Sequence, residues 1–253
     1  MGGTGGGGGG GGGSCFRKGT KILTLRGEIP VEELSNSDIA VGPSGEKVPV
    51  RWVGWRRVAI SALAPNRDNL LPVRISRGAL ADNVPKRDLY VSPLHALYLD
   101  GWLIPAGVLI NGTTITRCDD AAEVVYYHVE LAQHSVLLAE GAPAESYLEF
   151  GRNRTFFANS RGATSLHTEL PEAFRASSRI HWRLGRLRVP SWLLRGRVES
   201  LLARLGAVRC GEGIAAPCVY HGEAVDKVRR RLALRAEALA AELGATSELR
   251  QSA

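Results

Sequence analysis

Apolar residues between positions 15 and about 150 recur in short runs separated by turn residues, and this pattern predicts many short β-strands. The clearest run covers 48–58, where Val48, Val50 and Trp52 alternate with Pro49 and Arg51, as in a strand with one buried face. Strands this short and this closely spaced favour a compact all-β fold over alternating β-α-β units. The other predicted strands are 21–25, 29–34, 39–41, 71–75, 89–91, 96–99, 102–104, 113–117, 124–131 and 135–138.

Turn-forming residues lie between these strands. The segment 42–46, Gly-Pro-Ser-Gly-Glu, predicts a hairpin turn, and Asp100-Gly101 and Glu140-Gly141 are further turn signals. A short helix is predicted from Pro105 to Ile110, after the strand that carries Trp102.

The pattern of short strands ends after Tyr147. Residues 190–207 and 223–243 are predicted helices, and Gly244 is predicted to end the second one. This second helix is expected to pack on the body of the protein or on a partner helix. The basis is an apolar stripe at helical spacing, formed by Val225, Val228, Leu232, Ala236, Leu239 and Leu243.

Composition and charge divide the chain in the same way. The 253 residues are 44% apolar, enough to bury a sizeable core in one or two domains. Residues 151–253 carry 18 Lys and Arg against 9 Asp and Glu, whereas residues 1–150 carry 14 against 16. We therefore predict a glycine-rich leader at 1–14, an all-β domain at 15–150 and an arginine-rich, mostly helical extension at 151–253.

Several classes of protein are disfavoured. Apolar runs fall short of the roughly 18 residues of a membrane span, so no membrane partner is expected. The leader has neither a charge nor an apolar core and is expected to be flexible, not a secretory signal. The four cysteines are scattered without a CxxC pair, which signals neither a disulfide framework nor a zinc site. The expected location is the cytoplasm, or outside the cell by export without a cleavable signal.

Three motifs in the first half carry the chemistry. The chain opens its patterned region with Cys-Phe-Arg-Lys-Gly-Thr at 15–20, continues with Ser-Pro-Leu-His at 92–95 and reaches Tyr-His-Val-Glu-Leu at 127–131. In this order they resemble the Hint family, the hedgehog and intein autoprocessing domains, in a bacterial variety. Ser92 stands where the family has Thr, and His128 stands where Asp is common. The resemblance covers residues 15–150 and implies a horseshoe-like, pseudo-twofold β domain.

The resemblance implies cysteine-dependent self-processing at the Ser14–Cys15 peptide bond. Cys15 would attack the Ser14 carbonyl, an N-to-S acyl shift that turns the amide into a thioester. His95 would protonate the departing nitrogen of Cys15, because an imidazole exchanges protons near neutral pH. Ser92 would hydrogen-bond the scissile peptide. His128 would help to deprotonate the thiol, of which only a few per cent is thiolate at pH 7.

The resemblance says less about what happens to the thioester than about how it forms. Inteins end in a His-Asn pair whose Asn cyclises, but the matching place here holds Glu145-Ser146, which argues against full splicing. Hydrolysis, or transfer of the N-terminal segment to an outside nucleophile, fits better. The substrate would then be the protein's own N-terminal segment. No cofactor and no metal are expected.

Other interpretations remain open at this stage. The domain could be a catalytically silent Hint-fold module whose basic helical tail binds an acidic partner. A basic nucleic-acid binder is a further alternative, although no nucleic-acid motif and no aromatic interleaving accompany the positive charge. His128 could be an ordinary hydrogen-bonded strand histidine. Cys210, Cys218 and His221 could bind a metal, but their scattered spacing is poor evidence for a site.

Overall fold

The structure, a computed structural model, describes residues 14–63, 67–148, 154, 157–160 and 215–251. Two predictions, the flexible leader and the helix at 190–207, concern residues outside these ranges. The bounds of the strands are β1 (Phe16–Arg17), β2 (Lys21–Thr24), β3 (Gly27–Pro30), β4 (Ile39–Val41), β5 (Lys47–Ala59), β6 (Val73–Ile75), β7 (Leu89–Val91), β8 (Ala96–Leu99), β9 (Trp102–Pro105), β10 (Ile115–Arg117), β11 (Glu123–Leu131), β12 (Val136–Ala139) and β13 (Ala142–Glu145).

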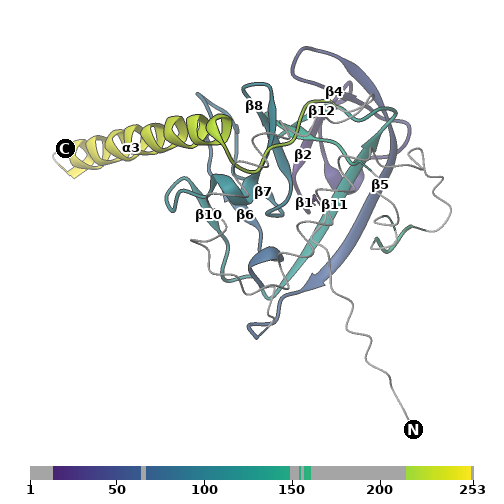
Figure 1. The fold of residues 1–253 in the computed structure, drawn as a ribbon, viewed down its shortest axis with the longest axis horizontal. Helices are drawn as coiled ribbons and strands as arrows, with labels where there is room; N and C mark the ends of the chain where they lie inside the picture. Colours follow the sequence, from purple (N-terminus) through teal and green to yellow (C-terminus); the bar gives the residue numbers. More distant parts are fainter. Residues whose placement is uncertain (1–13, 64–66, 149–153, 155–156, 161–214, 252–253) are drawn as a thin grey trace, which may run out of the picture.

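The described residues form one antiparallel sheet of 13 strands, in the order β10-β6-β7-β1-β11-β5-β4-β2-β12-β13-β8-β9, with β3 outside this order and paired with β2. The predicted all-β class is confirmed. Short 3-10 helices lie at η1 (Val31–Glu33), η2 (Arg67–Asn69) and η3 (Ala106–Leu109), and one α-helix, α3 (Glu223–Gln251), follows the sheet. Figure 1 shows the strands wrapped into a compact β body from which α3 projects.

The two longest strands, β5 and β11, form the central ladder of the sheet. They pair from Glu123 opposite Ala59 to Leu131 opposite Val50, with a register shift between Glu130 and Leu131. A β-bulge of this kind bends the strand that carries it and increases the local twist. β5 also pairs with β4, so it belongs to both halves of the bent sheet. The face of β5 that carries the buried Val48 and Val50 is called the inner face of the sheet.

Tight hairpins keep the remaining strands in register. Asp100-Gly101 connects β8 to β9 and Glu140-Gly141 connects β12 to β13, and all four of these residues have positive φ. Two consecutive residues with positive φ define the type I′ turn, whose twist matches that of paired strands. The predicted turns at these two places are confirmed.

The strand predictions fail where a motif is too short or contains proline. β1 and β13 were not predicted, because β1 has only two residues and β13 contains Pro143, a residue that usually argues against a strand. The predicted strand at 29–34 is wrong in its second half. β3 ends at Pro30, which has no N–H to extend the ladder, and the chain continues as η1. The predicted helix at 105–110 is the 3-10 helix η3.

The helix α3 packs on the β body along the predicted stripe. Val225, Val228 and Leu232 are each at most 2% exposed and belong to the main hydrophobic core. Of the two predicted positions for the stripe, the one against the body of the protein is correct. The predicted stop at Gly244 is wrong, because α3 continues to Gln251. A glycine costs a helix about 1 kcal/mol, and the good helix formers after it offset this cost.

Ion pairs lie at the edge of the contact between α3 and the β body. Arg231 Nη1 lies 2.6 Å from Asp100 Oδ1, and Arg235 Nη2 lies 2.8 Å from Asp82 Oδ1. The Arg235 Nε also donates to the carbonyl oxygen of Gly78. Within the described part of the chain, no helix is long and apolar enough to cross a membrane.

Candidate functional site

The peptide bond between Ser14 and Cys15 lies across the turn formed by residues 92–95. The Cys15 N–H donates to Ser92 Oγ at 2.8 Å, and the Ser92 N–H donates to the Cys15 carbonyl at 2.9 Å. The Ser14 hydroxyl donates to the carbonyl of Leu94 at 3.2 Å. Both residues of this bond are therefore fixed by the same four-residue turn, and the nitrogen that would leave is bonded to a hydroxyl.

The position of this turn follows from the strand before it. β7 ends at Val91, which pairs with Phe16 of β1, so the next residue comes level with Cys15. The turn closes through the His95 N–H, which donates to the Ser92 carbonyl at 3.0 Å. Gly107 of η3 supports the turn from outside by donating to the Pro93 carbonyl at 2.8 Å. A Cβ on Gly107 would come within 3.0 Å of that carbonyl oxygen, so the close approach favours glycine.

His95 is fully buried, and neither of its ring nitrogens has a hydrogen-bond partner among the residues that the structure describes. Its ring centroid lies 4.1 Å from that of Phe16 and 5.7 Å from that of His128. Burial without a partner lowers the pKa of His95 to about 3, so its imidazole is neutral at pH 7. An unpaired buried polar group is costly, and such a group needs a functional explanation.

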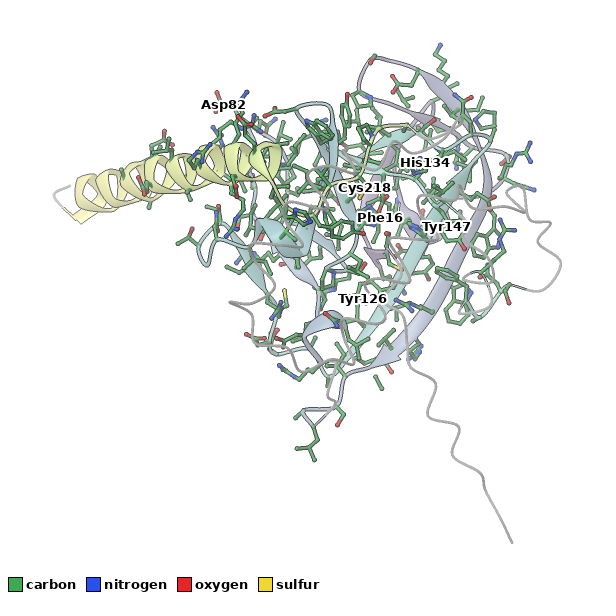
Figure 2. The ribbon with its side chains drawn as sticks, viewed as in Figure 1. Phe16, Asp82, Tyr126, His134, Tyr147 and Cys218 are labelled. Carbon is green, nitrogen blue, oxygen red and sulfur yellow. The ribbon has the colours of Figure 1, made fainter. Side chains whose placement is uncertain are left out.

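His128 is 2% exposed in β11, and its Nδ1 has no hydrogen-bond partner in the described part of the chain. Its ring centroid lies 4.7 Å from that of Tyr147, and Phe157 stacks on it with an interplanar angle of 12°. Burial holds the pKa of His128 well below its usual value, and the neighbouring His95, Arg56 and His134 lower it further. Figure 2 labels Phe16, Tyr126 and Tyr147, the aromatic side chains that flank this part of β1 and β11.

The Cys15 thiol is fully buried. Burial raises the pKa of the Cys15 thiol to about 11, and the charge of Glu145 also raises it. The Arg56 guanidinium acts in the opposite direction through its charge and a hydrogen bond to the sulfur. The thiol is thus neutral at pH 7, and Arg56 is the cation that the described residues place beside it.

Glu145, on β13, closes the other side of the site. Its Oε1 accepts a hydrogen bond of 2.9 Å from the N–H of Ala96, next to His95. Burial raises the pKa of Glu145 to about 7, and the neighbouring Ser14 side chain and the hydrogen bond from the Ala96 N–H oppose this rise. Glu145 therefore changes charge near neutral pH while it contacts the residue that carries the scissile carbonyl.

The structure brings together all the residues that the sequence analysis selected: Ser14, Cys15, Ser92, His95 and His128. Sequence reasoning missed Arg56, although a signal was present. Arg56 has the same strand parity as Val48, Val50 and Trp52, so alternation predicts it on the inner face. It also missed a part for Glu145, which entered only as the residue found in place of an intein's asparagine.

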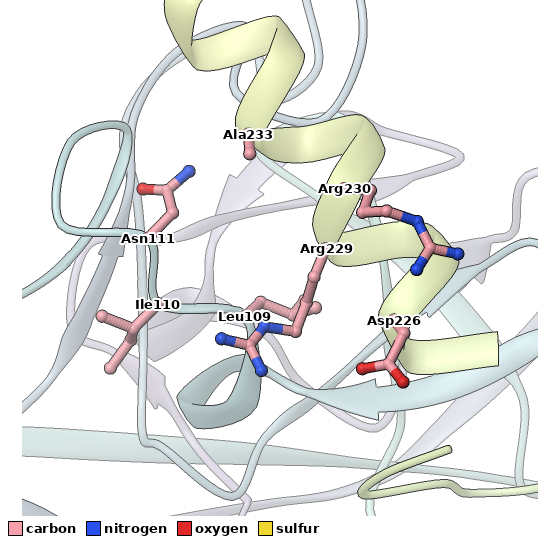
Figure 3. A pocket seen from close by; sticks show the side chains of 7 residues that line it. All are labelled: Leu109, Ile110, Asn111, Asp226, Arg229, Arg230 and Ala233. Atoms are coloured by element: carbon pink, nitrogen blue, oxygen red, sulfur yellow. The ribbon is translucent and has the colours of Figure 1, made fainter. Parts of the chain in front are cut away.

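The groove between α3 and η3 is a separate feature. It has a volume of about 340 Å³ and is lined by Leu109, Ile110, Asn111, Asp226, Arg229, Arg230 and Ala233 (Figure 3). None of the residues around Cys15 lines it. Among the described residues, no group of three His, Cys, Asp or Glu side chains could hold a metal ion. Cys210, one of the three ligands considered above, lies outside those residues.

The fold and the site define a β domain that holds Ser14 and Cys15 against a Ser–His turn. The Hint domain family model matches residues 14–151, more than half of the chain, and the chain therefore belongs to the Hint domain family. A search of curated proteins found no match.

Solved structures similar to this chain include inteins and an intein-like domain. The gp41-1 intein is 12% identical with a TM-score of 0.38, covering 52% of this chain and 98% of its own. A DnaB intein from Synechocystis sp. PCC 6803 is 8% identical with a TM-score of 0.38, covering 53% and 99%. A bacterial intein-like domain from Clostridium thermocellum is 16% identical with a TM-score of 0.36, covering 53% and 98%.

Proposed function

We propose that the β domain is a self-processing domain that acts on its own N-terminal segment and converts the Ser14–Cys15 amide to a thioester. Membership of the Hint family supports autoprocessing as the general activity. The observation that carries the specific proposal is the set of three hydrogen bonds that fix Ser14 and Cys15 to the turn at 92–95.

In the proposed step, the Cys15 sulfur attacks the carbonyl carbon of Ser14. A carbon–sulfur bond forms, the carbon–nitrogen bond breaks, and the thiol proton passes through the neutral His95 ring to the nitrogen of Cys15. His95 suits this transfer because it is neutral at pH 7 and neither ring nitrogen is occupied by another partner. Ser92 holds the nitrogen in place, at 2.8 Å from its hydroxyl oxygen.

The thioester would be resolved by water or by an external nucleophile. Either reagent would add to the Ser14 carbonyl carbon, and the carbon–sulfur bond would break to restore the Cys15 thiol. Asparagine cyclisation is not part of the proposal, because Glu145 and Ser146 stand at the corresponding place. Ser146 is fully buried, and its hydroxyl accepts a hydrogen bond of 2.9 Å from the Ser135 N–H.

The test is intact mass spectrometry of the purified full chain before and after incubation with dithiothreitol or hydroxylamine. Both reagents cleave thioesters, so an active domain releases a glycine-rich fragment that ends at Ser14. Cys15→Ala removes the nucleophile and is expected to abolish the release. Cys118→Ala, which changes a partly exposed free cysteine, is the matched control and retains it. Equal persistence of the wild type and Cys15→Ala would instead support the silent-module interpretation.

A further inference from the structure

Arg56 is an arginine on the inner face of the sheet. It lies on β5 directly opposite Tyr126 of β11, and its guanidinium carbon is 5.9 Å from the centre of the Tyr126 ring. β1 and β11 pair with Phe16 opposite Tyr127, and one further step in this register brings Cys15 level with His128. Cys15 and Tyr126 belong to the same buried cluster, so the Arg56 guanidinium over the Tyr126 ring lies on the side of the sheet that holds the sulfur.

Arg56 differs from most arginines of the sheet in having no acidic partner. In the part of the chain that the structure describes, no carboxylate forms an ion pair with it, and its buried Nε has no hydrogen-bond partner. The next residue, Arg57, points to the other face and pairs with Glu123 at 2.8 Å. A partly buried cation without a paired anion carries a desolvation cost, and an anion that forms beside it is stabilised.

The groups around the sulfur come from several elements, and among the described residues only Arg56 lowers the pKa of the Cys15 thiol. Burial and the charge of Glu145 from β13 raise the pKa of the Cys15 thiol, and Arg56 lowers it by charge and by its hydrogen bond. Tyr126 on β11 is itself kept neutral, because burial and the charge of Cys15 raise its pKa. His95 is neutral as well. Among the described residues, Arg56 is therefore the positively charged neighbour of a Cys15 thiolate.

His128 is poorly suited to hold the thiol proton. A proton on its ring would be buried and would lie near the Arg56 guanidinium, and both effects lower the pKa of His128. The Arg56 guanidinium therefore stabilises negative charge on the attacking sulfur more than the His128 imidazole does.

We propose that the Arg56 guanidinium is the catalytic group that stabilises negative charge on the Cys15 sulfur, in place of a basic His128. This inference rests on the proposed function. The charge develops as the thiol proton leaves for His95 and the sulfur bonds to the Ser14 carbon. It develops again when water adds to the thioester, the carbon–sulfur bond breaks, and the departing sulfur takes up a proton from the water.

Two measurements on the full chain test the proposal. The first is the dithiothreitol-induced release of the N-terminal fragment at pH 8. Arg56→Met keeps the apolar stem but loses the charge, and the expected rate is lower by about 10²–10³-fold, the usual effect of removing one fixed charge-stabilising donor. Arg56→Lys restores a point charge and recovers part of the rate. Arg57→Met, the matched control on the outer face, leaves the rate unchanged.

The second measurement does not depend on cleavage. In a His95→Phe background, iodoacetamide labels the cysteines at pH 8, and peptide mass spectrometry gives the rate at Cys15 relative to Cys118. Arg56→Met is expected to lower this ratio at least tenfold, Arg56→Lys to lower it less, and His128→Asn to leave it nearly unchanged. An equal ratio in the wild-type and Arg56→Met proteins overturns the inference, as does a tenfold loss confined to His128→Asn. A lowered ratio in a chain that never cleaves retains the thiolate role and rejects the proposed function.

Discussion

The site around Cys15 and the contact under α3 differ in whether their polar groups are paired. Under α3 the buried residues are apolar, and the charged residues at the edge are paired, as in Arg231 with Asp100. In the site, His95 is fully buried, and among the described residues neither of its ring nitrogens has a hydrogen-bond partner and Arg56 has no acidic partner. The α3 contact follows the ordinary rules of a stable interface, whereas the site retains a desolvation cost that stability alone does not explain.

The largest expected effect separates catalysis from stability at His95. His95→Phe keeps a planar ring beside Phe16 but removes the proton carrier, so fragment release should fall by about 10²–10⁴-fold. The free energy of unfolding should stay the same or rise, because two unpaired buried nitrogens disappear. Fragment release is followed by intact mass, and unfolding by urea in a Cys15→Ala background. His95→Ala serves as the second variant if the larger ring is not accommodated.

If His95→Phe cleaved at the wild-type rate, the site around Cys15 would no longer differ from the α3 contact in having a catalytic role. The same would follow if the variant lost several kcal/mol of stability without losing activity, since His95 would then be a structural residue like those under α3.

The second prediction concerns how stability depends on pH. The folded pKa of His95, about 3, is below its ordinary value of 6.5, so below pH 6.5 the unfolded chain binds a proton that the folded chain does not. The free energy of unfolding is therefore lost as pH falls from 6.5 towards 3, by about 1.4 kcal/mol for each pH unit at most. Glu145 acts with the opposite sign, because its pKa is raised to about 7 and its contribution is lost as pH rises from 4.5 to 7.

A comparison of Cys15→Ala with Cys15→Ala/His95→Phe isolates the histidine, because Glu145 and His128 remain in both chains. Urea unfolding at pH 7 and pH 5 should give a difference between the two proteins that changes by about 2 kcal/mol in favour of the variant at pH 5. A difference that is the same at both pH values would mean that His95 has a proton partner in the folded state.

Sequence patterns predicted the α3 contact in more detail than the site around Cys15. The packing of the stripe from Val225 to Leu232 was predicted correctly. Apolar residues at helical spacing identify the buried face of a helix without any knowledge of the rest of the fold. The site motifs could be selected only through the resemblance to a family, and Arg56 and Glu145 were not assigned roles. Their roles depend on the fold, because Arg56 on β5 and Glu145 on β13 are far from Cys15 in the chain and act on its thiol only once the strands have assembled. Local pattern also failed at Gly244, where the helix continues through a residue that often ends helices.

The smallest expected effect belongs to the ion pair that frames α3. Both side chains are partly exposed, at 45% for Arg231 and 37% for Asp100, so solvent screens the 2.6 Å contact. A double-mutant cycle with Arg231→Met and Asp100→Asn should give a coupling free energy of about 0.2–1 kcal/mol by urea unfolding. Asparagine suits this position because Asp100 has φ of 52°, which Asn tolerates. Fragment release should be unchanged in all three variants, and Arg230→Met is the matched control on the same helix. A coupling well above this range, or an altered cleavage rate, would show that the α3 contact supports the chemistry around Cys15 as well as the fold.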